Sequence, residues 1–267
     1  MPVNRQSTTI PFYFGASDKQ LFGCYHEPQC TIVRDTAVVI CQPMGHEYIY
    51  CHRALRQLAT KLCEAGFPVL RFDFYGCGDS AGEGDQGTVT QWLEDVSMAA
   101  AEVKSRAGGT QICLIGLRLG AALAFTAAAL RDDVAGLVLW DAVVLGTTYL
   151  AELTQLQSEA LRRRRQKQPN TPVAEVVGFS LPEALREELE HLNLHSVSPN
   201  LHARMLTLDT NDSAECVLAR HLITHGARVE SQQIKAAKIW QPTVDGNLLV
   251  PNQPVRSIVA WTSGAHA

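Results

Sequence analysis

The chain has 267 residues, of which 46% are hydrophobic and 19% charged, a composition typical of a globular protein with a sizeable core. Its net charge of −4 offers nucleic acid no electrostatic attraction, and no stretch approaches the ~18 apolar residues that span a membrane. No apolar targeting segment opens the chain, so we expect a cytoplasmic protein. Eight scattered cysteines without C-x-x-C spacing indicate reduced thiols and no metal site.

The first half of the chain alternates buried strands with helices. Two alternating runs, 10–14 and 21–26, are separated by a Gly-containing turn and predict a β-hairpin. Continuous apolar runs predict strands at 36–41, 68–73, 111–115 and 134–140. Helical periodicity predicts helices at 52–65, 90–105 and 117–130, whereas 42–48 has neither pattern and is predicted to be a loop. This alternation predicts an α/β fold, a mostly parallel sheet with helices on both faces.

The pattern changes between 145 and 198, which is polar, helical and interrupted by prolines. We expect this segment to be a helical cap inserted into a core formed by 1–144 and 199–267, and a possible surface for a protein partner. Its basic run at 162–165 is expected to be the solvated face of a helix. The core resumes with a strand at 201–208, a helix at 213–226, a strand at 228–233 and a closing helix at 253–261.

One short motif organises the chain. In Leu114-Ile115-Gly116-Leu117-Arg118-Leu119-Gly120-Ala121, a buried strand turns sharply into a helix of small residues. Gly-x-Ser-x-Gly in this context is a nucleophile elbow, a strained turn that lifts a side chain out of the sheet. Here the two glycines are present, but the turn residue is Arg118, whose guanidinium cannot attack a carbonyl carbon.

Four segments before the elbow carry a family resemblance: PMGHEY at 43–48, HRALRQLA at 52–59, GFPVLRFD at 66–73 and GCGDS at 76–80. They resemble the serine-aminopeptidase-like α/β-hydrolases. More narrowly, they are similar to bacterial hydrolase-like proteins associated with exosortase and exopolysaccharide gene clusters, some of which also carry Gly-Leu-Arg-Leu-Gly at the elbow. The resemblance implies the α/β-hydrolase fold with a helical cap, and implies hydrolysis only where the catalytic residues match.

In that fold the nucleophile follows the fifth strand, the acid usually follows the seventh, and the histidine lies after the eighth. Asp209 or Asp212 occupies the acid position, although Asp212 could instead cap the next helix. The last loop, 240–247, contains no histidine, and the only later one is His266. An intact Ser-His-Asp triad is therefore not expected.

Other nucleophiles and acids remain open. Cys77 lies between two glycines and Cys41 ends a strand, and His46 is a conceivable base for either thiol. Asp141 follows the sixth strand, an alternative acid position. In each case a packing or loop-fixing role is the simpler interpretation.

The role of Arg118 has two main interpretations. As a structural residue it forms an internal salt bridge to Asp141, Asp209 or Asp212, because a buried unpaired guanidinium is costly. As a functional residue it holds a carboxylate, a phosphate or a thioester-linked acyl carrier at the start of a helix.

The candidate ligand-binding residues are Met44, Gly45, His46, Arg118 and Leu119, because the 43–48 loop and the residue after the elbow supply the oxyanion-binding N–H groups of this fold. We therefore expect an atypical α/β-hydrolase-fold protein that binds an acyl, carboxylate or phosphate ligand or a partner, without a cofactor. The alternative is an active hydrolase or acyltransferase on ester or thioester substrates in bacterial exopolysaccharide or lipid metabolism.

Overall fold

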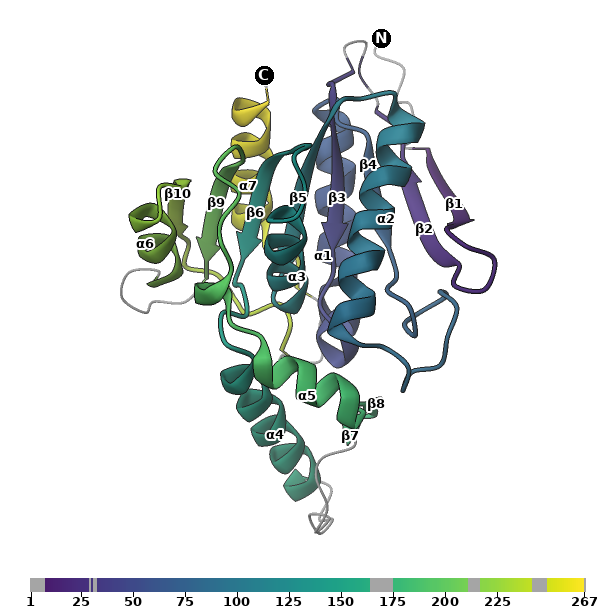
Figure 1. Ribbon diagram of the computed structural model, residues 1–267, viewed down its shortest axis with the longest axis vertical. Coiled ribbons are helices and arrows are strands. Elements are labelled where there is room, and N and C mark those ends of the chain that lie inside the picture. The colour runs from purple at the N-terminus through teal and green to yellow at the C-terminus, as the bar shows by residue number, and fades with distance from the viewer. Residues whose placement is uncertain are drawn as a thin grey trace.

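A computed structural model of the protein describes residues 8–28, 30, 33–163, 175–210, 217–241 and 249–266. The described residues form a central eight-stranded sheet in the order β1-β2-β4-β3-β5-β6-β9-β10 (Figure 1). The strands are β1 Thr9–Phe14, β2 Leu21–His26, β3 Thr36–Cys41, β4 Val69–Phe72, β5 Gln111–Leu117, β6 Val134–Trp140, β9 Arg204–Asp209 and β10 Arg228–Gln233. The pairs β1–β2 and β2–β4 are antiparallel, and the other neighbours are parallel.

Helices cover both faces of this sheet (Figure 1). The helices of the core are α1 Gly45–Glu64, α2 Val89–Ala107, α3 Leu119–Ala128, α6 Val217–Thr224 and α7 Asn252–Ala265. In β3, Ala37 and Val39 pack with the side of α2 and α3, and Val38 and Ile40 pack with the side of α1 and α7. Since side chains alternate along a strand, an entirely apolar strand is what a sheet covered on both faces requires.

The predicted hairpin, the strands at 36–41, 134–140 and 228–233, and the α/β class are confirmed. The predicted loop at 42–48 is wrong in its second half, because α1 begins at Gly45. The start of α1 lacks the Ser, Thr, Asp or Asn that usually caps a helix. Met44 is the N-cap and forms no side-chain hydrogen bond there, and Gly45 has φ +57°. In the predicted helix 213–226, residues 213–216 lie outside the described residues.

The stretch between β6 and β9 holds α4 Gly146–Arg163, β7 Glu175–Val176, β8 Phe179–Ser180, α5 Glu183–His191 and the 3-10 helix η1 Leu194–Ser196. The β7–β8 hairpin is not predicted from the sequence. Figure 1 shows α4 and α5 lying beyond the carboxyl ends of the parallel strands, the end at which β5 leads into the elbow. Only three residues of α4 are buried, among them Tyr149 and Leu153, and the rest of the helix is half-buried or exposed.

Candidate functional site

The turn between β5 and α3 has the geometry of a nucleophile elbow. Arg118 is the N-cap of α3 and has φ +55° and ψ −121°, a conformation that non-glycine residues rarely adopt. Backbone hydrogen bonds hold it there: Arg118 N–H donates to the Trp140 carbonyl at 3.0 Å, and Val143 N–H donates to the Arg118 carbonyl at 3.2 Å. The turn is therefore tied, through both the N–H and the carbonyl of Arg118, to the end of β6 and to the segment that follows it.

Both glycines of the motif are required by close backbone approach. A Cβ on Gly120 would lie 2.2 Å from the carbonyl oxygen of Cys41, and one on Gly116 would lie 2.3 Å from the Cα of Ala121. Since neither neighbour is a flexible side chain, the elbow closes against β3 and α3 only with glycine at both positions.

Two glutamates hold the Arg118 side chain. Its Nε donates to Glu47 Oε1 at 3.0 Å, and its Nη2 donates to a carboxylate oxygen of Glu152. The Tyr149 hydroxyl donates to the other oxygen of Glu47 at 3.0 Å. The guanidinium also lies over two aromatic rings, 5.4 Å from the centroid of Tyr149 and 4.9 Å from that of Trp240.

The two carboxylates differ in their surroundings. The side chain of Glu47 is 3% exposed and comes from the first turn of α1, whereas that of Glu152 is 53% exposed and comes from α4. Burial raises the pKa of Glu47, and the Arg118 charge and hydrogen bond partly offset that shift. Burial opposes the charge on Arg118, but Glu47 and Glu152 outweigh it and raise the Arg118 pKa. Arg118 is thus a permanent cation with one fixed and one half-exposed partner.

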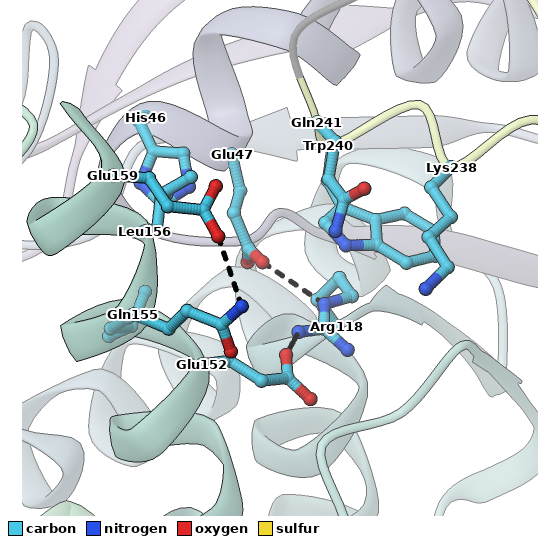
Figure 2. A pocket seen from close by; sticks show the side chains of 11 residues that line it. His46, Glu47, Arg118, Glu152, Gln155, Leu156, Glu159, Lys238, Trp240 and Gln241 are labelled. Carbon is cyan, nitrogen blue, oxygen red and sulfur yellow. Dashed lines mark hydrogen bonds and ion pairs between the residues drawn. The ribbon is translucent and has the colours of Figure 1, made fainter. Parts of the chain in front are cut away.

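A cavity of about 270 Å³ opens beside this ion-pair cluster (Figure 2). It is lined by His46, Glu47, Arg118, Glu152, Leu153, Gln155, Leu156, Glu159, Lys238, Trp240 and Gln241. Figure 2 shows the α4 side chains on one side of the cavity, with Trp240 and Lys238 beside Arg118 on the other. The Gln155 amide donates to Glu159 at 3.0 Å. The walls are therefore mainly polar and charged, with an aromatic and an aliphatic surface for a small apolar group.

His46 lines the cavity as an uncharged group. Burial, together with the nearby Arg118 charge, lowers the pKa of His46 to about 4. An imidazole with so low a pKa has little tendency to accept a proton near neutral pH, so His46 is a weak general base.

Apart from Arg118 and His46, none of the residues predicted for ligand binding lines this cavity. Met44 is the N-cap of α1 and packs partly buried against the core. Gly45 begins α1, and Leu119 is a buried residue that begins α3. The N–H of Leu119 lies in the first turn of α3, where backbone N–H groups have no helical acceptor.

The sequence predicts an aspartate partner for Arg118, and the structure gives it two glutamates instead. Asp141 is occupied elsewhere: it accepts hydrogen bonds from the backbone N–H and the hydroxyl of Thr210 at 2.9 and 2.7 Å. Asp209 ends β9 beside Asp141. Burial is the main cause that raises the pKa of Asp141, and the charge of Asp209 adds to that increase. Asp212 lies outside the described residues.

The alternative thiol nucleophiles are not poised to react. Cys41 is fully buried and burial raises its pKa, and burial also raises the pKa of Cys77 to about 12. Since the thiolate is the nucleophile, both groups are in their inert form near neutral pH. His266 packs against Gly136, near the amino end of β6, whereas the elbow follows the carboxyl end of the neighbouring strand β5.

Glu152 and Tyr149 are among the site residues that sequence reasoning misses. They lie one turn apart on α4 and reach the elbow only through the packing of that helix, which no local pattern encodes. Glu47 did leave a signal: it continues the buried stripe of Cys51, Leu55 and Leu58 toward the amino end of α1.

The described residues contain no group of three or more His, Cys, Asp or Glu side chains placed to hold a metal ion. Among the same residues, no helix combines the length and the apolar composition needed to cross a membrane.

The sheet order, the crossover helices and the strained turn after β5 together define an α/β-hydrolase fold. The chain belongs to the serine aminopeptidase family, S33, whose family model matches residues 35–216. A comparison with curated proteins finds no significant match.

Solved structures with the same fold are similar over nearly the whole chain. Est1E from Butyrivibrio proteoclasticus, solved with bound ferulic acid, is 17% identical with a TM-score of 0.67, covering 94% of this chain and 97% of that one. An esterase from Pyrococcus furiosus is 14% identical with a TM-score of 0.66, covering 98% and 92%. The α/β hydrolase domain-containing protein 10 from mouse is 15% identical with a TM-score of 0.60, covering 96% and 99%. At these identities the similarity establishes the fold.

Proposed function

We propose that this protein binds a small anionic ligand at Arg118 and does not hydrolyse it through a Ser-His-Asp triad. The ligand is a carboxylate, an acyl group with an anionic end, or a phosphate. One observation carries the proposal: the guanidinium of Arg118 projects from the elbow into the cavity, at the position where this fold carries its nucleophile. The elbow is thus a binding position, and the protein is a pseudoenzyme.

The surroundings of Arg118 support an anion. The residue begins a ten-residue helix, α3, whose N-terminal N–H groups and dipole favour negative charge. Lys238 lines the same cavity, and within the described part of the chain it forms no ion pair with a carboxylate. A cavity of about 270 Å³ lies just below the roughly 300–1,000 Å³ of typical ligand sites, which favours a small molecule.

Calorimetric titration with butyrate, phenylacetate and methyl phosphate tests this proposal. At least one of them is expected to bind the wild type, and Arg118→Lys should weaken binding by roughly tenfold, the equivalent of one charge-assisted hydrogen bond of about 1.5 kcal/mol. Lysine keeps the charge but lacks the planar fork that serves Glu47 and a ligand together. Arg106→Lys, on an exposed position of α2, is the control and should bind as the wild type does. Absence of binding by all three anions contradicts the proposal.

The second candidate is an active hydrolase or acyltransferase on ester or thioester substrates. Membership of the serine aminopeptidase family and the esterases among the similar structures favour it. A setting in bacterial exopolysaccharide or lipid metabolism, and a place among the exosortase-associated proteins, belong to this candidate. They rest on the resemblance of the four segments between 43 and 80, together with the Gly-Leu-Arg-Leu-Gly motif. It requires turnover of p-nitrophenyl esters, and labelling by a fluorophosphonate or a thiol-directed probe. Ester turnover that Arg118→Ala removes would establish it over the binding proposal.

We further propose that residues 145–198 act as a cap over the site and that the protein is cytoplasmic. The contact of Glu152 in α4 with Arg118 supports the first point, because it closes one side of the cavity. A protein partner at this cap is a related proposal. It predicts that a pull-down loses its partners when α4 and α5 are replaced by a short linker.

A further inference from the structure

The charge balance around Arg118 sets a condition for any anion that binds there. Arg118 faces two carboxylates, Glu47 and Glu152, and a third, Glu159, lines the same cavity. Lys238 supplies one further positive charge. An anion added to this set would meet a net negative cluster, so binding at Arg118 requires that one resident carboxylate leave the guanidinium.

The two resident carboxylates are not equally free to leave. Glu47 has both oxygens bonded, to Arg118 and to Tyr149, and its side chain is 3% exposed. Removing it from the guanidinium would leave a buried charge without its counter-ion. Glu152 is 53% exposed, bonds Arg118 through Nη2, and has solvent beside it. Its charge is easily rehydrated when the ion pair opens.

We propose that Glu152 occupies the place of the ligand's own carboxylate, and that a monocarboxylate binds Arg118 by displacing Glu152 while Glu47 remains bound. This inference rests on the function proposed above and narrows its ligand class. A monocarboxylate replaces Glu152 charge for charge on a planar guanidinium. A phosphate dianion brings a second charge against Glu47 and Glu159, so it binds less well. The same displacement removes the Glu152 contact between α4 and the elbow, whereas the hydrogen bond from Tyr149 of α4 to Glu47 remains.

The test compares monocarboxylate binding to wild type and to two variants of α4. Glu152→Gln removes the competitor, and butyrate and phenylacetate should bind it about fivefold more tightly, the equivalent of about 1 kcal/mol for a half-exposed ion pair. Glu159→Gln is the matched control: it removes the same charge from the same helix and cavity wall, but Glu159 accepts a hydrogen bond from Gln155 rather than from Arg118. It should change the affinity by a clearly smaller factor.

The outcomes separate this inference from the proposed function. If the wild type binds carboxylates through Arg118 but Glu152→Gln binds them equally or more weakly, displacement is overturned and the binding function stands. Equal gains in carboxylate affinity from Glu152→Gln and Glu159→Gln also overturn it, because the gain would then come from removing any negative charge from the cavity wall rather than from removing a competitor for Arg118. If neither the wild type nor Glu152→Gln binds any carboxylate, displacement is overturned; if methyl phosphate does not bind either, the binding function fails with it. Methyl phosphate that binds more tightly than butyrate overturns the ligand class.

Discussion

Replacement of Glu47 tests the physical account of the site most directly, because Glu47 is the fixed partner of a buried cation. Its carboxylate accepts hydrogen bonds from Arg118 Nε and the Tyr149 hydroxyl, each at 3.0 Å. In Glu47→Ala both donors lose their acceptor inside a site where Arg118 is 9% exposed. The variant is therefore expected to be strongly destabilised.

The magnitude follows from the partners that remain. Breaking a buried ion pair by removing one member costs about 3–5 kcal/mol, and Glu152 still faces Arg118, so we expect about 3 kcal/mol for Glu47→Ala. Glu47→Gln keeps the shape of the side chain and one acceptor oxygen. Its amide N–H₂ would face either Arg118 Nε or the Tyr149 hydroxyl, and that donor would lose its acceptor. We expect it to cost about 2 kcal/mol, the value of one hydrogen bond to a charged group.

Equilibrium unfolding in urea, followed by circular dichroism, measures these differences if the slope against denaturant is unchanged. Glu64→Ala is the matched control on the same helix, since Glu64 pairs with Lys61 at 2.7 Å but is 45% exposed. It should cost no more than about 1 kcal/mol. A Glu47→Ala variant as stable as Glu64→Ala would refute the reasoning, because Arg118 would then be accommodated without its buried counter-ion.

Three further predictions concern the elbow and its surroundings. Arg118→Ser should not create esterase activity above background, because His46 is the only histidine among the described residues lining the cavity and burial, the main cause of its lowered pKa, persists without the Arg118 charge; p-nitrophenyl butyrate measures this. The pKa of His46 is lower in the folded protein than in the unfolded chain, so the unfolded chain takes up the proton first and the free energy of unfolding falls as the pH falls from about 6.5 toward 4. Arg118→Gln removes a positive charge near the ring and should therefore raise the pKa of His46, which an NMR titration of the ring measures. Gly120→Ala should cost about 2–3 kcal/mol of unfolding free energy, because the new methyl group meets the backbone carbonyl of Cys41, and thermal or urea unfolding measures the loss.

The sequence predicts the framework of this site better than its contacts. The apolar runs of β3 and β6 and the glycines around Arg118 follow from local chemistry, because buried strands and tight turns admit few residue types. The pairing of Arg118 with Glu47 depends on where α1 begins, and that start has no capping side chain to mark it. The pairing with Glu152 depends on how α4 packs across the sheet end, which is a tertiary property.

The backbone of Arg118 bears strain that the side chain did not create. Its φ of +55° and ψ of −121° lie outside the left-handed basin that non-glycine residues sometimes occupy, and such positions cost about 1–3 kcal/mol. Strain of this kind persists only when surrounding interactions determine the conformation. Here the hydrogen bonds to Trp140 and Val143 fix the turn, and the glutamates fix the side chain.

A comparison of Arg118→Ala with Arg118→Gly isolates that strain. Both variants lose the guanidinium and leave Glu47 in the same unpaired state, so those losses cancel in the difference between their unfolding free energies. Alanine keeps the steric cost of positive φ, whereas glycine removes it and adds the roughly 0.5–1 kcal/mol entropic cost of a more flexible unfolded chain. We expect Arg118→Gly to be the more stable variant by about 1 kcal/mol, the reverse of the order in an ordinary helix or strand. Equal stability, or a more stable alanine variant, would mean that the turn relaxes once the ion pairs are gone. The elbow would then be held by Glu47 and Glu152 rather than by the fold.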